Sequence, residues 1–217
     1  MRRRCYLSAV AIISAAVTFA GEPALKSGPQ PDTVLPGPFD ALNINGKVAE
    51  GRQHCLVCQN GLNPAVLVFA REPAKDKDKS LTDLLKKLDD AVTKHGDYYL
   101  GGFAVILSPY ARSSITDDES RSDTTDLLDE ATKRNELVAR LKTRAEPLKH
   151  VILAAFPSGG PKGYNINGKA DVTVVFYNRL KVVGNWAFEE GKMSESDLGA
   201  IVKKVDETLA TVGKKKE

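Results

Sequence analysis

Three short apolar runs without a single polar residue constrain the fold of this 217-residue chain more than any other feature. They are AVLVFA at 65–70, FAVIL at 103–107 and VILAAF at 151–156. Runs of this length are typical of strands that are covered on both faces in a parallel sheet. Between them, residues 81–92 and 127–141 carry apolar side chains at helical spacing. The alternation predicts an α/β protein in which parallel crossovers feed one sheet.

The last third of the chain predicts two more strands and a helix. Residues 172–177 and 182–188 are apolar runs separated by four residues, a length that suits a hairpin. Ser194 and Asp197 form a helix-capping pattern, and an apolar stripe follows over 198–209. We therefore expect antiparallel edge strands and a closing helix.

This order of elements resembles the thioredoxin-like fold over residues 65–210. The most specific part is Tyr164-Asn165-Ile166 followed by DVTVVFYNRLKVVGNWAF at 171–188, which is similar to the closing ββα unit of that superfamily. The chain also resembles exported bacterial thioredoxin-like proteins of unassigned activity. The resemblance implies an α/β, thioredoxin-like mixed sheet flanked by helices, with a C-terminal ββα unit. Resemblance of fold does not by itself imply a reaction.

Two marks of the redox-active families are missing from their usual positions. Those families place a Cys-x-x-Cys just after the first core strand, where the start of a helix stabilises the thiolate. Here that position is REPAKDKDKS at 71–80, which contains no cysteine. They also place a cis-proline before the closing hairpin, where this chain has Ala170 and Asp171. Pro157 and Pro161 lie too far upstream to replace it.

A Cys-x-x-Cys does occur, at Cys55 and Cys58, before the first core strand. In an extended strand these residues would point to opposite faces with Cα atoms roughly 10 Å apart. A disulfide seldom joins Cα atoms more than about 7 Å apart. Leu56 and Val57 favour a strand, whereas the Gly-Asn-Pro-containing run after them favours a bend, so the local sequence leaves the geometry open.

Three interpretations compete for this cysteine pair. The first is thiol/disulfide exchange with protein thiols or disulfides, in which Cys55 or Cys58 is the catalytic nucleophile and the other the resolving thiol, with His54 lowering a thiolate pKa. The second is a structural disulfide, or two buried thiols, in a redox-silent binding or scaffold module. The third is a metal site of His54, Cys55 and Cys58, although a lone Cys-x-x-Cys supplies only half of a closed zinc site. No cofactor-binding motif is present, and we expect no cofactor.

Other candidate residues have simpler structural explanations. His95 at a helix end and His150 near a strand suit dipole or solvent contacts. The acidic run at 117–119 lacks the spacing of a calcium loop and lies within a polar stretch, 113–126, that we interpret as a surface loop. Trp186 suits packing, or a partner surface in the scaffold interpretation, and Tyr98 and Tyr99 admit the same two explanations.

The N-terminal region predicts export. Residues 1–20 combine a basic start, an apolar stretch and a small residue at position 20, the pattern of a cleaved signal peptide. The alternative is an uncleaved membrane anchor, but the apolar run reaches only about 16 residues, short of the roughly 20 that span a bilayer. We therefore expect no stable membrane insertion after cleavage. Residues 21–40 contain five prolines and predict a solvated linker before a thioredoxin-like domain at 41–213. The chain is therefore expected to be periplasmic or extracellular.

Charge argues against a nucleic-acid partner. The chain has 31 Lys and Arg against 28 Asp and Glu, and the excess of three equals the arginines at positions 2–4. The remainder is neutral, whereas binding that depends on phosphate neutralisation needs a basic surface.

Overall fold

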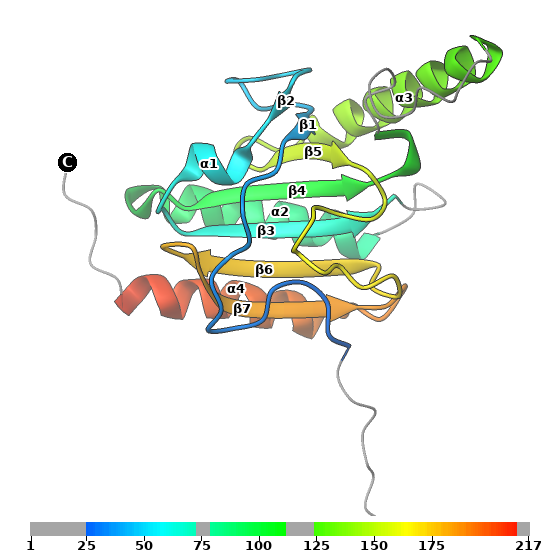
Figure 1. The fold of residues 1–217 in the computed structure, drawn as a ribbon. Coiled ribbons are helices and arrows are strands. Elements are labelled where there is room, and N and C mark those ends of the chain that lie inside the picture. Colours follow the sequence, from blue (N-terminus) through cyan, green and yellow to red (C-terminus); the bar gives the residue numbers. More distant parts are fainter. Residues whose placement is uncertain (1–24, 73–78, 112–123, 212–217) are drawn as a thin grey trace, which may run out of the picture.

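The computed structural model describes residues 25–72, 79–111 and 124–211. Within them the chain forms one seven-stranded mixed sheet flanked by helices (Figure 1). The strands are β1 Ala41–Asn43, β2 Gln53–His54, β3 Ala65–Arg71, β4 Gly101–Leu107, β5 Ile152–Phe156, β6 Val172–Asn178 and β7 Lys181–Phe188. The helices are α1 Leu56–Asn60, α2 Lys79–Lys94, α3 Thr124–Ala145 and α4 Glu195–Thr211, with short 3₁₀ turns at Gly96–Tyr98 and Pro109–Ala111.

The strand order is β2-β1-β5-β4-β3-β6-β7. Strands β3, β4 and β5 are the three continuous apolar runs, and they pair in parallel. Strand β6 pairs antiparallel with β3, and β7 pairs antiparallel with β6. These pairings confirm the α/β class, the parallel centre of the sheet and the antiparallel closing hairpin. The short antiparallel strands β1 and β2 extend the other edge and were not predicted.

The two faces of the sheet carry separate apolar cores. Helices α2 and α4 lie behind the sheet in Figure 1 and bury their apolar stripes there together with the last turns of α3. The opposite face is covered by α1, by the chain before β1 and by the connection between β5 and β6. Both faces of β3 and β4 are thus buried, which explains why these strands contain no polar residue apart from Arg71 at the end of β3.

The proline-rich segment differs from the prediction of a solvated linker. Over 25–40 it lies across β7 and β6 (Figure 1), and Leu35 and Phe39 are buried. The Ser27 and Thr173 hydroxyls form a buried hydrogen bond of 2.6 Å. Prolines keep this segment extended, and an extended chain can lay alternate side chains onto a sheet face as well as into solvent.

The β6–β7 hairpin turns on two residues. Arg179 and Leu180 have φ values of 52° and 60°, the left-handed conformation that two-residue hairpin loops require at both positions. Residues 178 and 181 therefore belong to the strands, and the predicted four-residue connection is two residues long.

None of the helices in the described part of the chain combines the length and apolar character needed to cross a bilayer.

Candidate thiol-disulfide site

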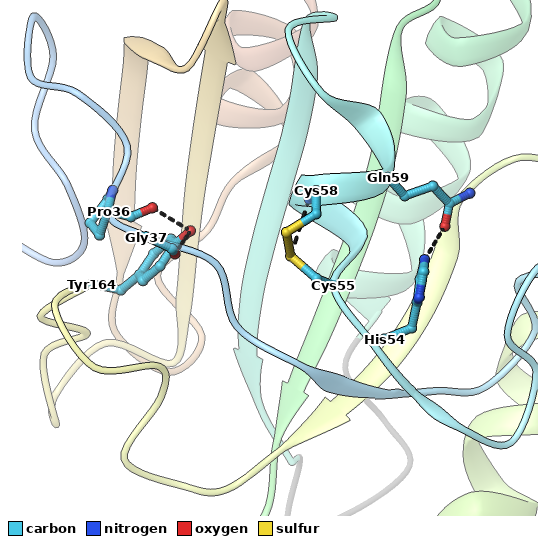
Figure 2. The surroundings of a disulfide bond; sticks show 7 residues. All are labelled: Pro36, Gly37, His54, Cys55, Cys58, Gln59 and Tyr164. Atoms are coloured by element: carbon cyan, nitrogen blue, oxygen red, sulfur yellow. Dashed lines mark hydrogen bonds between the residues drawn. A yellow bond between two sulfur atoms is a disulfide. The ribbon is translucent and has the colours of Figure 1, made fainter.

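Cys55 and Cys58 form a disulfide in the structure, with Cα atoms 5.2 Å apart. The bond is possible because the segment is helical: Cys55 is the N-terminal cap of α1, and Cys58 lies one turn later (Figure 2). The Cys58 amide donates a hydrogen bond to Cys55 Sγ at 3.1 Å. Gly61, at φ 59°, ends the helix after five residues. The turn thus resolves the geometry that the local sequence leaves open.

Side chains between the two cysteines and at the end of the helix hold α1 against the sheet. Leu56 and Val57 are buried in the core that covers this face. At the end of the helix the Asn60 side chain donates to the carbonyls of Asn63 (2.9 Å) and Pro64 (3.3 Å) and to the Tyr177 hydroxyl (3.4 Å). These contacts fix α1 to the turn before β3 and to the end of β6, so the cysteine pair sits on a rigid element.

The Tyr177 hydroxyl is a neutral partner for Asn60. Burial raises the pKa of Tyr177 to about 12, although the hydrogen bond from Asn60 acts in the opposite direction. The hydroxyl is therefore protonated at neutral pH. The apolar environment beneath the disulfide contains no charge from this group.

His54 does not face the sulfur atoms. Its Nε2 atom lies 2.8 Å from Gln59 Oε1, and the ring points toward that side chain and away from the disulfide (Figure 2). The role of His54 in activating a thiolate has no support in this arrangement. Within the described ranges no three His, Cys, Asp or Glu side chains are grouped so that they could hold a metal ion.

The usual redox end of the fold carries a polar network instead. At the C-terminal end of β3 the Arg71 guanidinium donates to the carbonyls of Ala170, Ser158 and Asn167. It thereby ties the chain before β6 to β3. The Ala170–Asp171 peptide bond is trans, as are all others in the described residues. This end therefore has a structural arginine in the region where the resemblance to redox-active thioredoxin-like families would place cysteines and a cis-proline.

Glu72, the next residue, makes a second set of polar contacts with the neighbouring strand and helix. Its carboxylate accepts hydrogen bonds from the Ser108 hydroxyl at the end of β4 and from Arg140 of α3. Ser108 is fully buried. Residues 73–78 of the same connection lie outside the described residues. The described polar groups here satisfy one another, which is the usual state of buried polar groups that serve structure.

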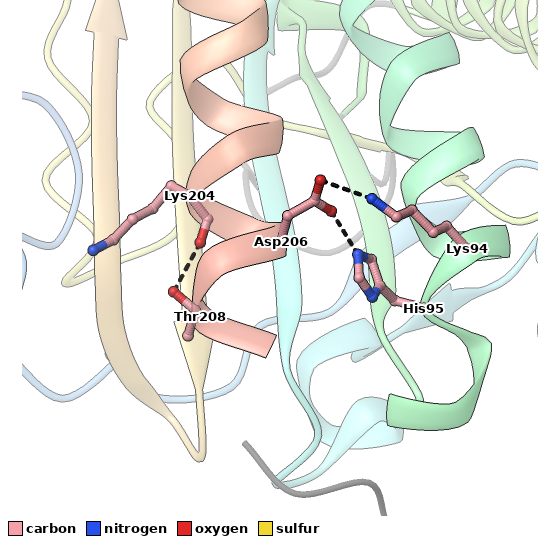
Figure 3. A network of polar contacts seen from close by, with 5 residues as sticks. All are labelled: Lys94, His95, Lys204, Asp206 and Thr208. Atoms are coloured by element: carbon pink, nitrogen blue, oxygen red, sulfur yellow. Dashed lines mark hydrogen bonds and ion pairs between the residues drawn. The ribbon is translucent and has the colours of Figure 1, made fainter. Parts of the chain in front are cut away.

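His95 has a structural role that links two helices. Its Nε2 atom lies 2.6 Å from Asp206 Oδ1, while Lys94 donates to Asp206 Oδ2 at 2.8 Å (Figure 3). The end of α2 is thus joined to α4. The His95 ring also stacks edge-on against Tyr98, with centroids 5.8 Å apart. His95 thus has a structural role, although its ring is buried and bonded to Asp206, whereas we expected contacts with the helix dipole or solvent.

The other secondary candidates do not join the cysteine site. His150 contributes its backbone amide to Asp89, and Trp186 packs partly buried against the core beneath α2 and α4. The acidic run at 117–119 lies outside the described residues.

The sequence pattern did not point to Asn60, although an asparagine before a glycine at the end of a short helix is a recognisable signal for a capped turn.

Asp206→Asn should lower the free energy of unfolding by about 1 kcal/mol at neutral pH. The substitution removes the charge that Lys94 and His95 contact, and ion pairs that are only partly buried contribute about this much. Burial tends to raise the pKa of Asp206, but its hydrogen bonds from Lys94 and His95 prevail and hold the pKa below the ordinary value of 3.8. A lowered pKa contributes stability above the ordinary value that is lost as pH falls through the folded-state pKa. Denaturant titrations of wild type and variant should therefore converge below pH 3.8. Glu207→Gln is the control, and an equal loss there would contradict the prediction.

Comparisons with solved structures find several similar chains, of which the first reaches a TM-score that shows the fold. A candidate protein disulfide isomerase from Bacteroides thetaiotaomicron is 12% identical, with a TM-score of 0.50 over 86% of this chain and 95% of that one. A candidate thiol:disulfide interchange protein DsbE from Chlorobium tepidum is 16% identical, with a TM-score of 0.48 over 88% and 100%. Yeast Sco1 is 12% identical, with a TM-score of 0.46 over 86% and 97%. A scan of protein-family models finds no match, and neither does a search among curated proteins.

The sheet order, the parallel centre and the closing ββα unit define an α/β protein with a mixed sheet between two covering layers. The chain has a thioredoxin-like fold. The cysteine pair lies toward the start of β3, because Asn60 at the end of α1 bonds to the turn directly before that strand. The Arg71 network lies at the other end of β3.

Proposed function

We propose that this protein carries out thiol–disulfide exchange with cysteine residues of other proteins, using Cys55 and Cys58. The observation that carries the proposal is the disulfide in α1, whose second member, Cys58, is exposed to solvent. An accessible disulfide on a firmly held helix can react with a thiolate without unfolding of the domain.

The reaction transfers two electrons from the substrate dithiol to the Cys55–Cys58 disulfide. A thiolate of the substrate dithiol attacks one sulfur of the pair, which forms a mixed disulfide and releases the other cysteine as a thiolate. The second substrate thiolate then attacks the substrate sulfur of the mixed disulfide. The products are an oxidised substrate and a reduced Cys55/Cys58 pair, and the two substrate protons go to the cysteines or to solvent. The same steps in reverse reduce a substrate disulfide.

The compartment proposed for this activity is outside the cytoplasm. The support is the signal-like pattern of residues 1–20, which lie outside the described residues. An oxidising compartment is one in which a disulfide persists and in which protein thiols are available as partners. Cleavage after residue 20 would also remove Cys5, leaving the pair as the only cysteines.

Reduction of insulin disulfides by the chain from residue 21 onward, with dithiothreitol as the electron source, tests the proposal. We expect catalysis above the dithiothreitol background, and we expect Cys55→Ser and Cys58→Ser each to reduce it to that background because two sulfurs are needed to complete the exchange. Val48→Ser, an exposed residue between β1 and β2, is the control and should keep full turnover. If wild type shows no turnover above background, the redox-silent binding or scaffold module is the better description.

A further inference from the structure

The two sulfurs of the disulfide have different surroundings. Cys55 is only 9% exposed and belongs to the apolar cluster that also contains Leu56 and Val57. Cys58 lies on the outer side of the same helical turn and is exposed. The order of the two cysteines along the helix causes this difference, since Cys55 begins α1 at the sheet surface and Cys58 is one turn further on (Figure 2).

This asymmetry determines which sulfur a substrate can reach. In thiol–disulfide exchange the incoming thiolate must contact the sulfur that it attacks, so the accessible sulfur becomes the site of the mixed disulfide. Approach to Cys55 would require displacement of the apolar side chains that bury it, at a cost in buried surface. Cys58 is exposed as a residue, so approach to it requires less displacement of apolar side chains than approach to Cys55.

The hydrogen bond within the turn suits Cys55 as the leaving sulfur. The Cys58 amide donates to Cys55 Sγ at 3.1 Å while the disulfide is intact. When the bond breaks, Cys55 takes the electron pair and becomes a thiolate, and the hydrogen bond becomes charge-assisted and stronger. The donor is in place before the negative charge develops, as for other preorganised donors that stabilise developing charge.

From these contacts we propose that Cys58 forms the mixed disulfide with substrate and that Cys55 is the buried leaving and resolving thiol. This assignment rests on the proposed exchange activity and deepens it. The substrate thiolate attacks Cys58 Sγ, the Cys55–Cys58 bond breaks, and Cys55 leaves as a thiolate. In the reducing direction the Cys58 thiolate attacks a protein disulfide, and the Cys55 thiolate then attacks Cys58 Sγ, which releases the second substrate thiolate.

Single-cysteine variants of the chain from residue 21 onward test the assignment. Cys55→Ser leaves only Cys58, and Cys58→Ser leaves only Cys55. Serine at position 55 is itself a good helix cap, so α1 should persist in that variant. Each reduced variant is mixed with dithiobisnitrobenzoate, and release of the coloured thiolate is followed by stopped flow. We expect Cys58 to react about 100-fold faster than Cys55, because a reactive thiol must be accessible.

A measurement on the wild-type protein avoids any effect of substitution on folding. The oxidised protein is mixed briefly with reduced glutathione, quenched in acid and mapped by mass spectrometry. We expect glutathione on Cys58 at about tenfold or greater excess over Cys55. Equal or greater labelling of Cys55, or an equally fast Cys58→Ser variant, would overturn the assignment and leave the exchange activity standing. Absence of any mixed disulfide in wild type and in both variants would overturn the assignment together with the exchange activity itself.

Discussion

Asp89→Ala should lower the free energy of unfolding by about 3 kcal/mol, because removing the carboxylate leaves three backbone amide donors without their acceptor. Asp89 Oδ1 accepts from the amides of His150 (2.7 Å), Val151 (2.8 Å) and Lys149 (3.0 Å), and the residue is only 7% exposed. These bonds join α2 to the start of β5. Urea unfolding followed by circular dichroism measures the effect.

The same carboxylate makes this stability dependent on pH. Burial on its own would raise the pKa of Asp89, but the three amides together outweigh it and hold the pKa below the ordinary value of 3.8. The unfolded chain then binds the proton more readily, so the contribution is present above the ordinary value and is lost as pH falls through the folded-state pKa. The difference between wild type and Asp89→Ala should shrink over that window.

Asp90→Ala provides the matched control for Asp89. Asp90 is the next residue of α2 and is exposed, so its replacement should change the free energy of unfolding by no more than about 0.5 kcal/mol. If the two variants lose equal stability at neutral pH, the three amide contacts are not the cause.

Phe39→Ala should cost about 3 kcal/mol of unfolding free energy, as expected when a buried aromatic ring is removed from a packed cluster. The Phe39 ring contacts three others, with centroid distances of 5.1 Å to Tyr164, 5.5 Å to Phe156 and 6.0 Å to Phe69. Chemical denaturation of the variant tests whether residues 25–40 are part of the folded unit. A large loss would show that the domain begins before residue 41.

Val34→Ala is the control from the same segment. Val34 is 75% exposed, and its truncation should leave stability within about 0.5 kcal/mol of wild type. If Phe39→Ala also has no effect, the segment contributes nothing to stability and behaves as the solvated linker that its prolines predict.

The central sheet was predictable because burial on two faces leaves a local signature. Strands β3, β4 and β5 contain only apolar residues except for Arg71 at the end of β3, and α2 carries its leucines on one face. The continuous apolar runs therefore indicate strands buried on both faces, and the helical spacing of the leucines indicates a helix with one apolar face. Strands β1 and β2 have three and two residues, too few for any period to appear.

Other features depend on contacts between residues distant in sequence. The packing of 25–40 depends on Tyr164 and Phe156, and proline content alone favours a linker. The hydrogen bonds of Asp89 depend on a turn about 60 residues further along the chain, although an aspartate on the apolar face of α2 is a local sign that a buried partner exists. For the cysteine pair, the sequence identified the two residues, and the helical turn that joins them emerged only from the structure.

The disulfide closes a very small ring, since only Leu56 and Val57 stand between the two cysteines. A cross-link this short restricts the unfolded chain far less than one that spans distant segments. Breaking it removes little conformational constraint, and α1 keeps its attachment through Asn60 and the two enclosed residues. The oxidised and reduced proteins should accordingly melt at similar temperatures. Reduction and reoxidation of the cysteine pair should then leave the fold of the domain unchanged.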